Sequence, residues 1–209
     1  MQRQVIRTRF MLSRNPRFVT NIIIVINVAI YLVLAFLSRS LDIDQGLLVN
    51  AGAQVNLLVS EGQIWRIFTA MFLHFSIFHI GLNMLSLFFI GTAVEVFYGK
   101  WRYLVIYLGS GIAGGITTYL LMPPNVIAAG ASGAIFGVFG ALGIFYVLNR
   151  RALGAFGGGA IMNWLFFLGL NLVWGFATPG IGIWDHIGGL VAGMIIGALL
   201  MPRLRSRQF

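Results

Sequence analysis

The chain contains no cysteine, and acidic residues are scarce: five Asp and Glu stand against 14 Lys and Arg in 209 residues. The absence of cysteine excludes disulfides and thiolate metal ligands, and it leaves the redox compartment unassigned. Charged residues make up only 9% of the chain, against about 25% in a typical soluble domain. Hydrophobic residues make up 59%. This composition excludes an ordinary soluble domain and predicts a membrane protein.

Long apolar segments dominate the sequence. A membrane-spanning helix needs about 20 mostly apolar residues. The first apolar segment follows five arginines and has no small-residue cleavage site, so it indicates a retained span rather than a signal peptide. Two shorter apolar pieces, 55–59 and 67–77, are expected to belong to a structured outer loop over 38–77. The predicted fold is an all-α polytopic membrane protein, a compact six-transmembrane-helix bundle over 18–201 with basic tails at 1–17 and 202–209. Its predicted spans are 18–37, 78–97, 103–122, 131–148, 160–177 and 183–201.

The basic residues sort to one side of this predicted bundle. If six helices alternate in direction, 12 of the 14 Lys and Arg fall on the same side as the two termini, and only Arg39 and Arg66 fall on the other. An excess of Lys and Arg marks the cytoplasmic side, so both termini are expected in the cytoplasm. Topology therefore explains the net charge of +9. No nucleic-acid partner is inferred, and the lipid bilayer is the expected surroundings.

Three of the predicted spans carry polar side chains at a similar depth. Spans two, four and six all run inward, which places His79 and Asn83, Ser132, and His186 near their outer ends. The i, i+4 spacing puts His79 and Asn83 on one helix face. At 1.5 Å per residue, these groups lie within roughly 10 Å of the outer surface. Ionisable residues inside a membrane are costly and are usually functional.

Small residues predict close packing of spans four and six. Gly189, Gly193 and Gly197 recur every fourth residue in span six, and Gly133, Gly137 and Ala141 do so in span four. Such faces let two helix backbones approach closely. The glycines alone indicate only packing, but they would bring Ser132 and His186 together.

These residue types fit acyl-transfer chemistry. A neutral imidazole at His186 could take the Ser132 proton and later protonate the leaving amine. Oxyanion donors would come from Asn83, from His79 and from the free N–H groups at the start of the Ser132 helix. Gly130 and Gly133 remove side-chain bulk, so that a carbonyl could approach.

In these residues the chain resembles the rhomboid intramembrane serine proteases. Gly130-Ala131-Ser132-Gly133 matches the GxSG motif of that family's fourth helix, His186 matches its catalytic histidine on the sixth, and His79–Asn83 matches its HxxxN. Trp65-Arg66 and Glu95–Gly99 match two further family motifs. The likeness covers 18–201.

The resemblance implies an endopeptidase with a Ser132–His186 dyad and no acid, which cleaves in or near transmembrane segments of substrate proteins. It implies an oxyanion hole from His79, Asn83 and the Ser132 N–H, with Gly130 in the oxyanion and substrate-binding site and Gly133 and Gly189 in support. It also implies a Phe136 ring stacked on the catalytic imidazole. A tyrosine hydroxyl found there in some members is absent here. Lateral access past span five and the loop 178–185 is a further family expectation. No cofactor is implied, and no oligomeric state is assigned.

Several residues have other interpretations. Asp185 is poorly placed to orient the His186 ring, because adjacent helical residues point about 100° apart, so a loop or cap role is expected. Glu95 lies at the wrong depth for catalysis and is expected to be a buried hydrogen-bonding or ion-pair residue. Arg66 is expected to hold the outer loop. His74 could help to retain water near the site or could be an interfacial histidine, and the sequence favours neither. The histidines lack HExxH spacing, and no carboxylate shares their predicted depth, so no metal is predicted.

Two other classes of function compete with the protease. A noncatalytic rhomboid-like protein would bind membrane clients, but such relatives typically lack the Ser or the His that this chain has. A channel or transporter should line a path through both leaflets, whereas these polar residues cluster at the outer end. The expected location is a membrane, in a minimal prokaryotic plasma-membrane form, with the active site near the outer face.

Overall fold

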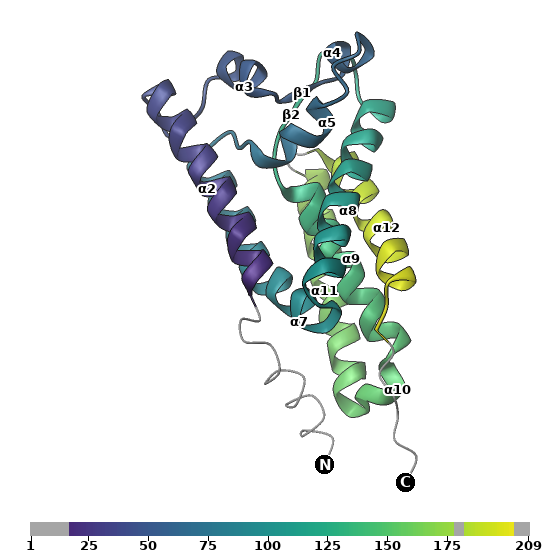
Figure 1. Ribbon diagram of the computed structural model, residues 1–209. Coiled ribbons are helices and arrows are strands. Elements are labelled where there is room, and N and C mark those ends of the chain that lie inside the picture. The colour runs from purple at the N-terminus through teal and green to yellow at the C-terminus, as the bar shows by residue number, and fades with distance from the viewer. Residues whose placement is uncertain (1–16, 178–181, 203–209) are drawn as a thin grey trace.

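A computed structural model describes residues 17–177 and 182–202, which are mostly helical. In chain order the elements are α2 (Phe18–Ser38), α3 (Gln45–Ala51), β1 (Gln54–Val55), α4 (Asn56–Ser60), α5 (Arg66–Thr69), the 3₁₀ helix η1 (Ala70–Phe72), α6 (Ile77–Ser86), the π-helix η2 (Leu87–Gly91), α7 (Thr92–Tyr98), α8 (Lys100–Leu121), β2 (Ile127–Ala128), α9 (Ser132–Leu148), α10 (Arg150–Leu153), α11 (Ala155–Ala177) and α12 (Ile183–Leu199). The long helices stand side by side; the short elements α3, α4, α5, β1 and β2 gather at one end of them, and the short helix α10 lies at the other (Figure 1).

Helices occupy each of the six segments that the sequence predicts as spans. Within the described residues, three of them are long and apolar enough to cross a membrane: α2, the continuous run Ile77–Tyr98 formed by α6, η2 and α7, and α8. Helices α9 and α12 are also apolar but have 17 residues each. Helix α11 has 23 residues. The structure is therefore mostly helical with membrane character, while the count of six spans stays a prediction.

The start of α2 is fixed by a carboxylate from α7. Glu95 is 3% exposed and accepts hydrogen bonds from the backbone N–H groups of Val19 and Thr20, both at 2.9 Å, and from the Thr20 hydroxyl at 2.8 Å. A helix leaves its first N–H groups without partners inside the helix, and its dipole favours a negative charge there. Glu95 is thus the buried hydrogen-bonding residue that the sequence predicts, and it ties α7 to α2.

The outer loop predicted over 38–77 is folded around Arg66. This buried guanidinium donates from Nη1 to the carbonyls of Val49 at 2.7 Å and Ala53 at 2.9 Å, and from Nε to Gln63 at 2.7 Å. Its position confirms the expected structural role. The loop is also joined to the segment before α9, because β1 pairs antiparallel with β2. These two strands of two residues each depart from the all-helical expectation.

The centre of the bundle is α9, which packs against α8 and α12. The close approach predicted from the small residues is confirmed. A Cβ added at Gly189 would overlap the carbonyl oxygen of Gly133, and one added at Gly193 would overlap that of Gly137. Because these backbones touch, the first turns of α9 and α12 lie side by side.

Candidate active site

Helix α6 supplies the first two polar groups of the site. Ser76 caps this helix by accepting a hydrogen bond from the His79 N–H at 3.2 Å, which fixes His79 in the first turn. Asn83, one turn further on and buried, donates from its amide nitrogen to the His79 carbonyl at 3.0 Å. The two side chains therefore share one face of α6, as their spacing predicts.

A glycine separates His79 from Ser132. Gly130 has φ of +141°, a conformation that side chains other than glycine rarely adopt. A Cβ at this position would lie 2.9 Å from Cε1 and Nε2 of His79 and 3.6 Å from Oγ of Ser132. The Gly130 N–H donates to the Ala70 carbonyl at 2.9 Å, which anchors the segment. The bare glycine thus leaves open the space between the imidazole and the hydroxyl.

Ser132 is the first residue of α9. The residue before it, Ala131, is the N-cap and makes no side-chain hydrogen bond to the helix. The first-turn N–H groups have no partner further back in the helix, and they lie near the Ser132 hydroxyl together with the positive end of the helix dipole.

His186 lies in the first turn of α12 and is buried. Its ring stacks on that of Phe136, with centroids 4.2 Å apart and planes 8° from parallel. This is the contact that the resemblance implies. The Nδ1 atom of His186 is buried and has no hydrogen-bond partner among the described residues. Within the described residues, no carboxylate makes a hydrogen bond to the His186 ring.

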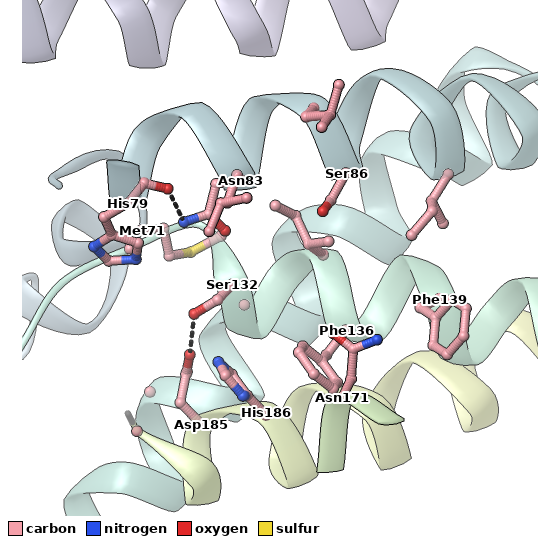
Figure 2. A pocket seen from close by; sticks show the side chains of 18 of the residues that line it. Met71, His79, Asn83, Ser86, Ser132, Phe136, Phe139, Asn171, Asp185 and His186 are labelled. Atoms are coloured by element: carbon pink, nitrogen blue, oxygen red, sulfur yellow. Dashed lines mark hydrogen bonds between the residues drawn. The ribbon is translucent and has the colours of Figure 1, made fainter. Parts of the chain in front are cut away.

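The neighbouring residue, Asp185, meets Ser132 instead. The Ser132 hydroxyl donates to Oδ2 of Asp185 at 3.4 Å, the dashed line between them in Figure 2. The sequence makes Asp185 a poor partner for the His186 ring and predicts a loop or cap role, but it does not predict this contact with Ser132. The signal was present: Asp185 precedes Gly189 by four residues, so it lies on the same helix face as the glycines that contact α9.

All these groups line one cavity of about 1270 Å³. His79, Asn83, Ser132 and His186 lie on its wall together with Asp185, while α11 contributes apolar and amide side chains on another side. Figure 2 shows Ser132 between the α6 residues above it and the α12 residues below it. The structure thus brings together the residues that the sequence predicts at one depth. Residues 178–181 of the expected access loop lie outside the described residues.

His74 is fully buried beside the cavity. Its ring meets the His79 ring edge-on, with centroids 5.1 Å apart, and neither ring nitrogen has a hydrogen-bond partner in the described part of the chain. Burial, assisted by the nearby His79, lowers the pKa of His74 to about 3. This histidine is therefore neutral at physiological pH. Because His74 is buried inside the protein, it does not have the exposed position of an interfacial histidine.

The family of the chain follows from comparison with known proteins. The model of the Rhomboid domain matches residues 61–203. The chain belongs to the rhomboid family. It is 41% identical over 157 residues to the rhomboid protease GluP of Bacillus subtilis, a match covering 73% of this chain and 29% of that relative. It is 36% identical over 152 residues to the putative rhomboid protease YdcA of the same organism, covering 73% and 75%.

A plant protein extends this comparison. RHOMBOID-like protein 1 of Arabidopsis thaliana is 34% identical to the chain over 155 residues, which are 74% of the chain and 39% of the plant protein. The matched region is thus well under half of GluP and of this plant relative. Family membership together with the apolar helices makes the chain an integral membrane protein of the rhomboid family.

Proposed function

We propose that this rhomboid-family chain is an intramembrane serine endopeptidase with Ser132 as nucleophile and His186 as general base. One observation carries the proposal: a serine at the first position of α9 and a histidine stacked on Phe136 line the same cavity as a pair of oxyanion donors. The names of the relatives GluP and YdcA as rhomboid proteases point to the same chemistry.

The first step forms an acyl-enzyme. The Ser132 Oγ attacks the carbonyl carbon of a peptide bond, and its proton passes to His186. The tetrahedral intermediate then collapses, His186 protonates the leaving amine, and the amine departs. A water molecule then gives a proton to His186 and attacks the acyl carbon, the bond from this carbon to Oγ breaks, His186 returns the proton to Oγ, and the carboxyl product leaves. Stacking on Phe136 holds the imidazole in one orientation through this cycle.

The oxyanion would be stabilised on the α6 side of the cavity. Asn83 uses one amide hydrogen for the His79 carbonyl, and the other is available to the negative oxygen. The His79 ring N–H and the Ser132 backbone N–H complete the set. Gly130 supports it, because any side chain there would occupy the space next to the His79 ring. Gly133 and Gly189 support it by letting α9 and α12 touch.

The expected substrates are transmembrane segments of other proteins. The cavity lies within a bundle of apolar helices, and side chains from α6 and α11 line it. The distribution of basic residues favours a cytoplasmic position for both termini and, with six alternating spans, a site near the outer face of the membrane. A peptide bond close to that face is therefore the expected position of cleavage.

Labelling with a fluorophosphonate tests the proposal without a known substrate. The purified parent protein is expected to react at Ser132, and Ser132→Ala and His186→Ala are expected to stay unlabelled while unfolding at nearly the parent temperature. Ser86→Ala is the matched control, because this serine lines the same cavity from α6 and, within the described residues, makes no hydrogen bond to Ser132 or His186. Its labelling should equal that of the parent.

Cleavage of a reporter transmembrane protein then tests the reaction itself. A labelled parent that cleaves the reporter, beside an inactive Ser132→Ala, supports the endopeptidase. A folded parent that binds membrane proteins but neither reacts nor cleaves would favour the noncatalytic client-binding function instead.

A further inference from the structure

Asp185 occupies a place that the proposed chemistry does not use. It lies at the start of α12, in line with Gly189 and Gly193 on the face that contacts α9. Its carboxylate fills a notch between two other glycines. A Cβ added at Gly114 of α8 or at Gly133 of α9 would overlap its oxygen atoms. The notch therefore exists only because both positions are glycine.

This notch lies at the start of α9. The N-cap residue, Ala131, has no side chain that could accept a hydrogen bond from the first turn. A carboxylate from another helix stands there instead, next to Gly133, where the helix dipole favours a negative charge. Asp185 thus takes the position that a capping side chain would have, although it comes from a helix far away in the sequence.

The same carboxylate accepts a hydrogen bond from the Ser132 hydroxyl. The hydroxyl donates to Oδ2 of Asp185 at 3.4 Å, and no hydrogen bond joins Ser132 to His186 within the described residues. A hydroxyl has one proton to donate. While this proton points at Asp185, it is not available to the imidazole that must remove it.

We propose that Asp185 is a positioning residue that holds the Ser132 hydroxyl in a resting orientation, from which it must turn to His186 before the serine can attack. The inference rests on the proposed function, because it concerns the same serine. The carboxylate takes no part in bond making. It opposes activation by competing with His186 for one proton.

The replacement Asp185→Asn reverses this hydrogen bond. An amide has nearly the size of a carboxylate, and its oxygen can still lie against the first turn of α9. Its NH2 group donates to the Ser132 oxygen, which leaves the hydroxyl proton free for His186. The variant is therefore expected to have a more reactive serine, whereas structural damage at the site would make the serine less reactive.

The test measures how fast a fluorophosphonate labels each protein over a range of probe concentrations. In the reaction the Ser132 oxygen bonds to phosphorus, fluoride leaves, and the hydroxyl proton passes to His186. Asp185→Asn should raise the limiting rate about tenfold, which corresponds to ~1.4 kcal/mol. The probe concentration for half-maximal rate should not change, because Asp185 acts on the serine and not on probe binding.

Two further variants make the result decisive. Asp185→Ala removes the hydrogen bond without replacing it and should also label faster. Asp44→Asn is the control, since Asp44 caps α3 by accepting from the Leu47 N–H at 3.0 Å and lies away from Ser132. It should leave the rate unchanged. Unchanged or slower labelling in whichever Asp185 variant folds, with the parent labelled, overturns the inference alone. If neither the parent nor any variant is labelled, the chain has no activated serine, and the proposed function and the inference fail together.

Discussion

The contact between α9 and α12 can be tested at Gly189, which lies three residues after His186. In Gly189→Ala the new Cβ would overlap the Gly133 carbonyl oxygen and lie 2.8 Å from its carbon and 3.1 Å from the Gly133 Cα. Carbon atoms in contact prefer about 3.5–4.0 Å. The obstacle is backbone on both sides, so no side chain can turn away. Helix α12 must therefore retreat from α9 by about 1 Å.

This retreat has a cost in stability and a larger one in activity. Overpacking of a close contact typically costs ~1–3 kcal/mol. For a chain of this size each kcal/mol lowers the melting temperature by roughly 2–4 °C. The shift also separates His186 from Ser132, and a misplacement of about 1 Å between reacting groups can lower a rate ~100-fold. Labelling by a fluorophosphonate should thus fall much more than stability does.

The assay compares melting temperature and labelling rate, the rate being measured well below the melting temperature of every variant. Gly158→Ala and Gly169→Ala are matched controls on α11, because a Cβ at either position has no atom within 4 Å. Alanine favours a helix over glycine by roughly 0.5–1 kcal/mol, so these variants should be as stable as the parent or more stable. If Gly189→Ala melts and reacts as the parent does, the close backbone contact between α9 and α12 and its role in bringing the dyad together are refuted.

Two other predictions concern the α6 side of the cavity. Asn83→Ala should lower kcat for a cleaved reporter by ~100-fold or more with little change in KM, because an oxyanion donor acts on the transition state; an effect confined to KM would contradict this role. His74 has a folded pKa of about 3, below the 6.5 of a free histidine, so its contribution to stability is lost as pH falls through the window from 6.5 to 3. Between pH 7.5 and pH 5 the buried imidazole should lower the parent's free energy of unfolding by ~2 kcal/mol. Melting curves should therefore show a pH-dependent loss of stability that is smaller by this amount in His74→Gln; equal pH dependence in both proteins would refute the prediction.

Much of the site was predictable because helical spacing carries it. The i, i+4 pair on α6 and the glycines every fourth residue on α12 determine helix faces without any knowledge of the fold. Alternating span direction then brings Ser132, His186 and the α6 pair to one depth. Physical constraints of this kind depend only on the rise and turn of a helix, so they can be read from the sequence.

Other features had no such signal. The strands β1 and β2 have two residues each, too few for an alternating pattern to appear. The π-helix η2 interrupts the second predicted span at Leu87–Gly91, although its residues are ordinary for an apolar helix. Both depend on contacts between distant segments. The pairing of the loop with the segment before α9 and the packing of Gly91 against Tyr103 are examples.

The close contact between α9 and α12 also explains why two adjacent polar residues on the wall of one cavity, Asp185 and His186, make different contacts. Where the glycine backbones touch, no side chain fits between the helices, whereas the space beside Gly133 at the N-terminus of α9 holds a side chain. Asp185 continues the line of Gly189 and Gly193, so its side chain enters this space and meets Ser132. His186, turned by about 100°, lines the cavity and stacks on Phe136. Gly189→Ala should therefore disturb both contacts and slow the serine, whereas Asp185→Asn changes only the first and should speed it. If Gly189→Ala slows labelling and Asp185→Asn speeds it, the effect of packing between α9 and α12 is distinguished from the effect of the hydrogen bond between Asp185 and Ser132.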